Sequence, residues 1–411
     1  MAFILIMMMV MLLILMIMML IMIAILTKVL IKNPSRALLT LVSTSIYVLD
    51  NLGPSDFRDK VSNHLENALK NETICINLWR VVLDHASISS NIDVDQFNIA
   101  VEYNTTISVN KELKKYLNLR IYKKKTYNKL ERQVNLGVLV WFHGGGWVLG
   151  SVDGYDNTCS EFSMMTNLVV VSVEYSLAPE RPFPAAIEDA LIALSWVKDH
   201  IVSFGGNPNS IFLGGDSAGG NIAASVMTTL LNDDDDDDVF RSTLFPSSVL
   251  FRDLHASIVK GLVLYYPSLD SCVDRSCWGS YEEYEHDLIL PLSRMIWFRK
   301  MYQNHYPLSE SSQHVFAPLH TPPHLLRLFP ETLILVGGKD ILRDENLAFA
   351  SKLIKEGVPT RVELYNYSLH AFLQLDLHGS REKSIRFVSE QLQRIQLHHQ
   401  SKSEVEKCLI T

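Results

Sequence analysis

A short strand, a glycine-flanked turn and an apolar helix follow one another along residues 211–231. The turn has the pattern G-x-S-x-G, with the residues Gly215-Asp216-Ser217-Ala218-Gly219. Between a strand and a helix, this pattern holds the serine in a strained conformation at the carboxyl end of the strand. The two glycines are needed because side chains would clash there. The pattern predicts an exposed Ser217 hydroxyl above a sheet, with a helix packed directly behind the strand.

The rest of the chain alternates between strands and helices. Residues 97–103 and 117–122 have the pattern of extended strands. An apolar run occurs at 138–142, and the valine-rich run at 169–173 is typical of buried parallel strands. Further strands are predicted at 211–213, 262–266, 333–336 and 362–365. Helical periodicity is present at 186–198, 221–231 and 380–397. This β-α-β alternation predicts an α/β fold with a mostly parallel sheet covered by helices.

A second glycine-rich turn follows the strand at 138–142. It reads His143-Gly144-Gly145-Gly146-Trp147. Consecutive glycines let the backbone approach a ligand closely and point N–H groups at it, as an oxyanion hole requires. We expect Gly144 and Gly145 to donate together with Ala218, whose N–H lies at the start of a helix. Gly146 and His143 would support the loop, and His143 would orient it rather than act as the base.

A nucleophilic serine needs a base, and the base needs an acid that orients it. In this topology the chain order is serine, acid, histidine. Asp340 follows the strand at 333–336, and His370 follows the strand at 362–365. Asp344 is the competing acid, but its position favours the next helix. Three further histidines are expected at the surface: His320, His324 and His378.

Composition excludes several other classes of protein. The 411 residues are 48% apolar by count, which leaves ample surface to bury and excludes disorder as the dominant state. The formal net charge is −8, but residues 233–238 are six aspartates. Without them 37 basic residues face 39 acidic ones, and no basic stripe indicates a nucleic-acid partner. No metal-binding cluster is visible, and the chemistry needs no cofactor.

Cysteines are few and show no C-x-x-C pair, which disfavours a disulfide scaffold and a structural zinc site. The five are Cys75, Cys159, Cys272, Cys277 and Cys408. We expect buried or free thiols. One bridge could form in an oxidising compartment, but the sequence does not select the pair.

The amino-terminal segment predicts a membrane anchor. Residues 1–26 contain no charged side chain, and about 20 apolar residues suffice to cross a bilayer. A cleavable signal would have a shorter apolar core, a basic start and a small-residue cleavage site, none of which is present. Residues 27–96 are interpreted as a helical stem, and residues 97–398 as the domain that contains the motifs above.

The orientation of the anchor is open from the residues alone. Lys28, Lys32 and Arg36 follow it and no basic residue precedes it, which would leave the catalytic part in the cytosol. Three N-x-S/T sequons indicate the opposite side, because they are glycosylated only in the lumen. They begin at Asn71, Asn104 and Asn366.

Residues 232–257 are interpreted as an insertion that opens with the aspartate run. Blocks of like charge usually form solvated loops. Adjacent aspartates repel one another and offer no defined metal geometry, so we expect a solvated acidic loop.

The ordered set of these motifs resembles the hormone-sensitive-lipase group of α/β-hydrolases and is most similar to the arylacetamide deacetylases. The matching pieces are 143–147, Glu174-Tyr175-Ser176-Leu177-Ala178-Pro179-Glu180, Gly215-Asp216-Ser217-Ala218-Gly219-Gly220-Asn221, Asp340-Ile341-Leu342-Arg343-Asp344 and His370-Ala371-Phe372. The resemblance spans about residues 97–380, and the apolar amino terminus also fits.

The resemblance implies a triad of Ser217, Asp340 and His370. It also implies an α/β-hydrolase fold with a helical cap, to which the stem 27–96 and about residues 270–330 contribute. It implies a protein of the endoplasmic-reticulum membrane whose catalytic domain faces the lumen, which favours the sequons over the positive charges. It also implies hydrolysis of carboxylic esters, aryl amides or neutral lipid esters. Two positions depart from the group: Ser176 replaces an arginine, and Ala371 replaces a glycine.

Two alternatives remain. A binding protein on the same fold would lack the catalytic histidine, whereas His370 is present. Amide rather than ester hydrolysis would use the same triad, so the sequence does not separate the two. The sequence leaves the oligomeric state open. A glycan on Asn366 would lie four residues before His370, so we expect that sequon to be unused.

Overall fold

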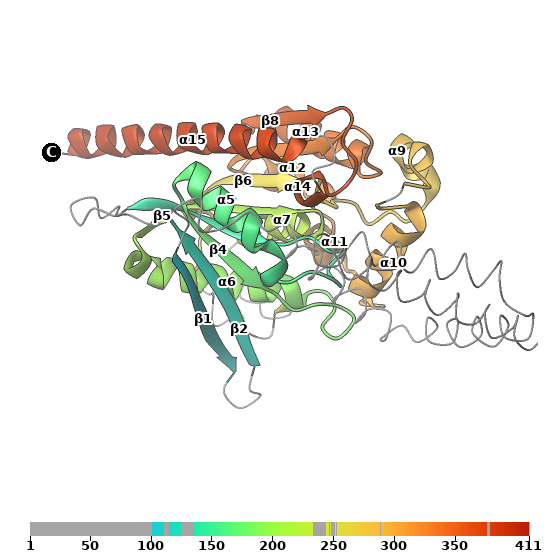
Figure 1. The fold of residues 1–411 in the computed structure, drawn as a ribbon, viewed down its shortest axis with the longest axis horizontal. Coiled ribbons are helices and arrows are strands. Elements are labelled where there is room, and N and C mark those ends of the chain that lie inside the picture. Colours follow the sequence, from blue (N-terminus) through green and yellow to red (C-terminus); the bar gives the residue numbers. More distant parts are fainter. Residues whose placement is uncertain are drawn as a thin grey trace, which may run out of the picture. The chain divides into compact units, whose positions relative to one another are not determined.

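The computed structural model describes residues 101–110, 115–124, 135–232, 244–245, 247, 251, 253–287, 289–375 and 379–410 (Figure 1). These residues belong to one compact unit, Asp93–Thr411. The expected anchor 1–26, the stem 27–96, Asn71, the aspartates 233–238 and His378 lie outside the described residues. In the described part of the chain, no helix is long and apolar enough to cross a bilayer.

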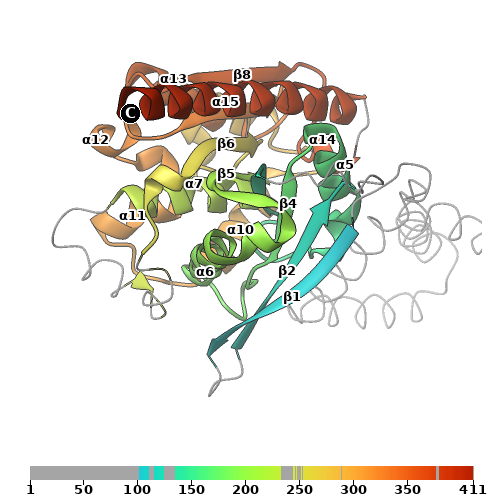
Figure 2. The same cartoon turned by 90° about the vertical axis from the view of Figure 1, so that its left-hand side faces the viewer.

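Eight strands form one sheet in the order β1-β2-β4-β3-β5-β6-β7-β8, which Figure 2 shows from β1 at the bottom to β8 at the top. Their bounds are β1 Val101–Asn110, β2 Lys115–Lys123, β3 Leu136–Phe142, β4 Val169–Glu174, β5 Gly206–Asp216, β6 Val259–Tyr265, β7 Glu331–Gly337 and β8 Thr360–Tyr365. Each overlaps an apolar or alternating run identified in the sequence.

The sheet is mostly parallel, as predicted. The pairs β1–β2 and β2–β4 are antiparallel, and every other neighbouring pair is parallel. Parallel strands end at the same edge of a sheet. The loops that follow β3, β5, β7 and β8 therefore lie at one edge, and these four loops contain the candidate site residues.

Helices cover both faces of the sheet. On one face lie α5 (Asp156–Thr166), α14 (Phe372–Leu375) and α15 (Ser380–Ile410). On the other lie α6 (Ala185–His200), α7 (Ala218–Leu231) and α13 (Arg343–Lys355). The sequence predicted α6, α7 and α15 but not α5.

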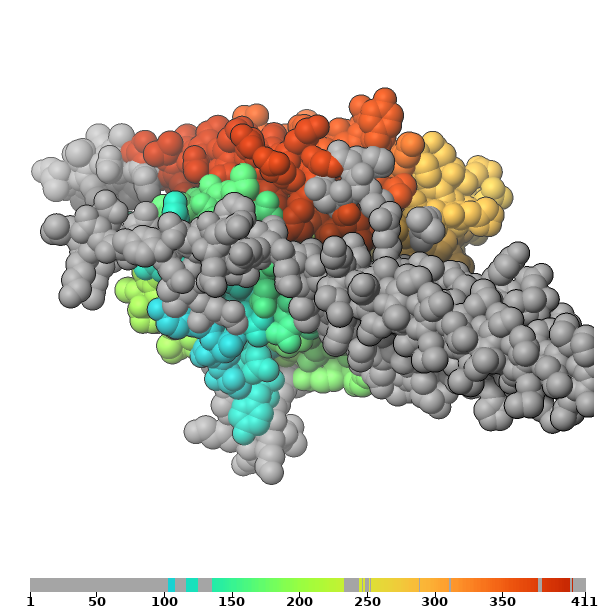
Figure 3. Space-filling model, viewed as in Figure 1, coloured from blue at the N-terminus to red at the C-terminus, as the bar shows by residue number. Residues whose placement is uncertain are grey.

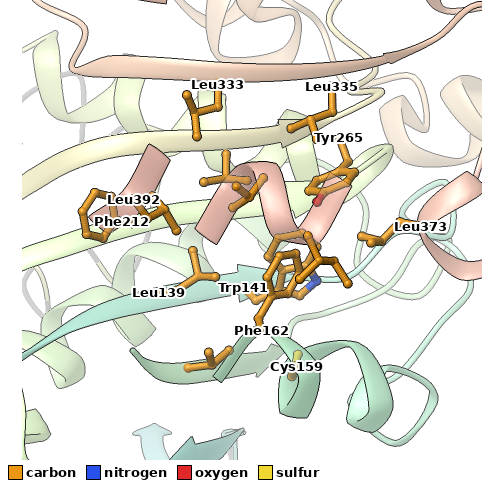
Figure 4. Close-up of a cluster of buried hydrophobic side chains, with 14 of the residues drawn as sticks. Leu139, Trp141, Cys159, Phe162, Phe212, Tyr265, Leu333, Leu335, Leu373 and Leu392 are labelled. Atoms are coloured by element: carbon orange, nitrogen blue, oxygen red, sulfur yellow. The ribbon is translucent and has the colours of Figure 1, made fainter. Parts of the chain in front are cut away.

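The core beneath α5 and α15 is built from alternate residues of the central strands (Figure 4). Leu139 and Trp141 point into it from β3, because side chains two apart share one face of a strand. The helix α15 contributes a stripe at helical spacing: Ile385, Val388, Leu392 and Ile395. Burial of this stripe fixes α15 against the sheet although the helix as a whole is polar.

The segment between β6 and β7 contains four short helices. They are α9 (Gly279–Glu283), α10 (Leu292–Gln303), α11 (Glu310–Phe316) and α12 (Pro323–Leu326). This segment coincides with the cap region expected at about residues 270–330. Within the insertion 232–257, the described residues Leu244, Phe245, Phe251 and Leu254 are buried, so these side chains pack against the domain.

Cys272 and Cys277 form a disulfide before α9, and Cys159 is a buried thiol. The expectation of free thiols is therefore wrong for the first two. They lie five residues apart in an irregular segment, and the turn brings their Cα atoms to 6.6 Å, within the range that a disulfide spans.

Candidate active site

Ser217 lies in the sharp turn between β5 and α7. Its backbone has φ 54° and ψ −116°, a conformation that a non-glycine residue adopts only under constraint. The turn depends on its glycines. A Cβ on Gly219 would lie 1.9 Å from the carbonyl oxygen of Phe142, and a Cβ on Gly215 would lie 2.4 Å from the backbone of Gly219. The local sequence thus permits a close approach of helix and strand that presents Ser217.

The loops after β7 and β8 bring Asp340 and His370 to this serine. The distance from His370 Nε2 to Ser217 Oγ is 2.9 Å, and the distance from His370 Nδ1 to Asp340 Oδ2 is 2.8 Å. Asp340 Oδ1 accepts a further hydrogen bond from the backbone N–H of Leu342 at 2.9 Å. These bonds form a continuous chain from the carboxylate to the hydroxyl.

Electrostatics favour a basic imidazole at this position. Burial is the largest single influence and lowers the pKa of His370, but the carboxylates of Asp340, Asp216 and Asp287 together raise it, and the net direction is upward from 6.5. With Nδ1–H donating to Asp340, Nε2 of the neutral ring accepts the proton of the Ser217 hydroxyl. The ring edge of Tyr266 packs against the imidazole with ring centres 4.9 Å apart, which restricts its rotation.

The glycine loop after β3 adopts backbone conformations that only glycine accepts easily. Gly145 has φ 120° and Gly146 has φ 62°. A Cβ on Gly145 would lie 2.1 Å from the carbonyl oxygen of Leu149, and one on Gly146 would lie 2.3 Å from the ring of Phe298. Among the described residues, no hydrogen-bond acceptor is found for the N–H groups of Gly145, Gly146 or Ala218.

Gly144 differs from the sequence prediction. Its N–H donates to Asp216 Oδ1 and to the hydroxyl oxygen of Tyr155, both at 3.0 Å. A donor engaged in this way is not available to an oxyanion, so its assignment as an oxyanion donor is not supported. Gly144 therefore anchors the loop. Gly146, which was expected only to support the loop, has an unengaged N–H, as Gly145 does.

Asp216 organises this anchor, a role that the sequence did not reveal. Its carboxylate is buried and accepts from Gly144 N and, at 2.8 Å, from the Tyr155 hydroxyl. Burial raises the pKa of Asp216 to about 6, and the hydrogen bond from Tyr155 opposes this increase. Asp216 stands at the variable position of the G-x-S-x-G pattern, and no spacing in the sequence connects it to Tyr155.

His143 is a packed residue of the loop. It is fully buried, its Nδ1 donates to the carbonyl of Gly144 at 2.8 Å, and its ring stacks on Tyr175 at 4.2 Å. Burial lowers the pKa of His143 to about 4, so the ring is neutral at physiological pH. It orients the loop and takes no part in the chain of bonds to Ser217.

The remaining predicted residues lie apart from the triad. Asp344 is in α13, where it accepts from Arg343 and from the backbone of Ser280. His320 is partly exposed and bonds Asp270 at 2.8 Å, and His324 is exposed.

Two positions differ from the group that the sequence resembles. Ser176 donates to the buried Asp189, and Ala371 has φ 60°. Two predicted sequon asparagines are exposed: Asn104, which accepts from Arg120, and Asn366. Within the described ranges, no group of three or more His, Cys, Asp or Glu side chains could hold a metal ion.

Comparison with known proteins places this geometry in a family. Residues 139–374, more than half of the chain, match a protein family whose description is alpha/beta hydrolase fold. The chain belongs to this family. The match bears out the hormone-sensitive-lipase-like part of the resemblance.

Relatives of the chain include enzymes. An AB hydrolase superfamily protein of Schizosaccharomyces pombe is 33% identical over 58% of this chain and 63% of its own length. Lipase 2 of a Moraxella species is 32% identical over 63% of this chain and 60% of its own length. The alignments therefore span less than two thirds of these two proteins. An esterase structure from the archaeon Pyrobaculum calidifontis has a TM-score of 0.62 at 27% identity, and the match covers 78% of this chain and 91% of that one.

Proposed function

We propose that the protein is a serine hydrolase that cleaves carboxylic esters through an acyl-enzyme on Ser217. The observation that carries the proposal is the unbroken chain of hydrogen bonds from Asp340 through His370 to Ser217. Relatives named as a lipase and as esterases support the same reaction class. A binding protein on this fold would have no need of the chain of bonds.

The reaction follows from the positions of the protons. His370 Nε2 takes the proton of the Ser217 hydroxyl as Oγ attacks the ester carbonyl, and Asp340 stabilises the imidazolium that forms. The negative charge that develops on the carbonyl oxygen is bound by the unengaged N–H groups of Gly145, Gly146 and Ala218. His370 then gives its proton to the leaving alcohol, and a water activated by His370 hydrolyses the acyl-enzyme.

The substrate class is proposed from the resemblance and from the apolar surroundings of the glycine loop. Trp147 stacks on Tyr302 with ring centres 4.5 Å apart, and Phe298 packs against Gly146. These rings favour hydrophobic acyl or aryl groups near the site. The resemblance to arylacetamide deacetylases adds aryl amides as a second substrate class, for which the same nucleophile and acid would serve.

Location is part of the proposal. An uncharged segment of 26 residues is long enough to anchor the protein in the endoplasmic-reticulum membrane. The disulfide Cys272–Cys277 favours an oxidising compartment and therefore a lumenal catalytic domain. Lumenal glycosylation would be detected as a mobility shift on treatment with an N-glycosidase, lost when Asn71 and Asn104 are both changed to Gln. A protein that shows no shift and is digested by protease in sealed microsomes would instead face the cytosol.

The test of activity uses the full chain in detergent and a series of p-nitrophenyl esters from acetate to palmitate. Wild type is expected to turn over at least part of the series and to react covalently with a fluorophosphonate. Ser217→Ala is expected to lose about 10⁶-fold in kcat and all labelling. The chain-length optimum would distinguish short acyl from long lipid esters, and a p-nitroacetanilide substrate would reveal amidase activity. Turnover that persists in Ser217→Ala, or its absence in a folded wild type, would refute the proposal.

A further inference from the structure

Two buried charges lie between the catalytic loops and take no part in the triad. Arg299 of α10 and Glu345 of α13 are 2% and 0% exposed, and their Nη2–Oε2 distance is 3.0 Å. A second bond joins Nη2 to Oε1 at 3.2 Å. The pair thus connects the segment after β6 with the helix after β7, two segments whose gold and orange surfaces adjoin in Figure 3.

On one side the pair holds the turn that follows β6. Glu345 Oε1 accepts from the backbone N–H of Leu269 at 2.7 Å, and Arg299 Nη2 donates to Ser268 Oγ at 3.1 Å. The backbone N–H of Ser268 in turn donates to the carbonyl oxygen of Ser217 at 3.2 Å. Only Ser268 therefore lies between the pair and the backbone of Ser217.

On the other side the pair holds α9 against the loop of the catalytic acid. Arg299 Nη1 donates to the Tyr281 hydroxyl at 2.8 Å, and that hydroxyl donates to Glu345 Oε2. Ser280, which precedes Tyr281, donates from Oγ to the carbonyl oxygen of Ile341 at 2.7 Å. Ile341 is the residue after Asp340. The loop of Asp340 is thus bonded to the helix that the pair fixes.

Stability alone does not explain this arrangement. Removing two charges from water costs free energy that their attraction often fails to return, and well-packed apolar residues of similar volume are frequently as stabilising. An apolar pair would make no directional hydrogen bonds. Glu345 and Arg299 together bond a backbone N–H, a serine and a tyrosine from separate segments. The pair is suited to fixing the relative positions of those segments.

We propose that Arg299 and Glu345 are positioning residues of the triad, which hold the Ser268 turn and the Asp340 loop in the one arrangement that aligns Ser217 with His370. The inference rests on the proposed esterase function. Neither residue bonds Ser217, Asp340 or His370, so their effect is expected in the chemical step, and substrate affinity should change little.

The experiment measures kcat per reactive serine in the full chain, with active sites titrated by a fluorophosphonate and p-nitrophenyl butyrate as substrate. Glu345→Gln keeps the size of the side chain and removes its charge. It is expected to lower kcat per titrated site about 10-fold while KM changes less than about twofold. A purely structural role would lower the number of titrated sites and leave kcat per site at the wild-type value, which would overturn the proposal.

Two further variants cover the case in which an unpaired buried arginine prevents folding. Arg299→Met combined with Glu345→Met removes both charges and should show the same loss in kcat per site. Arg299→Lys keeps the charge without the planar fork and should lose about threefold. Wild-type kcat per site in either variant would overturn the inference.

The matched control is Arg275→Ala, which breaks exposed ion pairs of the same segment with Glu282 and Glu285. It should leave kcat per site unchanged. An equal loss in this control would show that any change in the segment lowers the rate, and would also count against the proposal. A wild type that neither reacts with the fluorophosphonate nor turns over the ester would refute the proposed function itself, and with it this inference.

Discussion

At the scale of single residues, the site separates groups that act on substrate from groups that hold them. The N–H of Gly144 is used to fix the loop to Asp216, which leaves the next two glycines unengaged. The nucleophile turn and the oxyanion loop are therefore joined by one buried carboxylate. This junction predicts that a change at Asp216 lowers the rate and alters the pH dependence of stability.

Asp216→Asn should lower kcat/KM about 10-fold, because the amide offers one acceptor where Gly144 and Tyr155 each donate to a separate oxygen. Its effect on stability depends on pH. The pKa of Asp216 is about 6 in the folded protein and 3.8 as the reference for the unfolded chain, so the folded wild type binds more protons between these values. Wild type should therefore lose stability as the pH rises from about 4 to 6.

The amide introduced by Asp216→Asn would carry no such titration. The free energy of unfolding of the variant, measured in urea, should increase relative to wild type by up to about 3 kcal/mol between pH 4 and 7. Tyr155→Phe serves as the control, because it removes one donor and keeps the carboxylate. A difference between wild type and Asp216→Asn that stays constant over this range would contradict the assigned pKa.

The protonation state of His370 sets the pH dependence of the reaction. The base must be neutral, and its pKa lies above 6.5 because Asp340 and the more distant Asp216 and Asp287 together outweigh burial. We expect kcat/KM for p-nitrophenyl acetate to fall on the acid side with a midpoint above 6.5. Asp340→Asn should reduce the rate by about 10⁴. A midpoint below 6.5 in wild type would show that burial dominates.

At the scale of elements, much of the fold followed from the sequence because buried parallel strands are continuous apolar runs. The runs at 138–142 and 169–173 became β3 and β4 within two residues. Asp340 and His370 could be proposed because both follow predicted strands, although β8 is only partly buried. The helix α5 was not predicted, because the side chains that it buries against β4 and α15 include the polar Thr158, Ser163 and Thr166, which do not form an apolar stripe.

The parts of the site that escaped prediction are contacts between distant segments. Gly144 and Gly146 are identical in sequence terms, and only the backbone dihedral angles and the position of Asp216 give them different roles. Arg299 and Glu345 lie 46 residues apart in the sequence, on two different helices. No pattern in the sequence indicates that they form a pair. Tertiary contact of this kind is not encoded in local periodicity.

The turn between β5 and α7 makes a prediction at this scale. Gly219→Ala would place a Cβ 1.9 Å from the carbonyl oxygen of Phe142, so strand and helix must separate. We expect loss of fluorophosphonate labelling and of soluble folded protein. Gly357→Ala is the matched control, because Gly357 has φ 83° but nothing within 4 Å of the added Cβ. It should cost only about 1–2 kcal/mol and retain labelling, and equal behaviour of the two variants would contradict the steric argument.

At the scale of the whole molecule, the described unit contains the complete triad, and the apolar amino terminus is proposed to serve attachment. Deletion of residues 1–26 should release the protein from membranes and leave kcat/KM for p-nitrophenyl acetate, a small soluble ester, within about threefold of the full chain. The measurement compares both forms in the same detergent, with sedimentation in its absence. A truncated protein that still sediments with membranes would place the attachment elsewhere.

The position of α15 has a consequence for how the chain is made. Its stripe of Ile385, Val388, Leu392 and Ile395 completes the core over central strands that are synthesised more than a hundred residues earlier. His370 and β8 also follow these strands in the chain. Until α15 is synthesised, the part of the sheet face that this stripe covers is exposed. We expect nascent chains that end before this stripe to bind chaperones and to lack reactivity at Ser217, so that hydrolysis begins only after residue 395 has been synthesised.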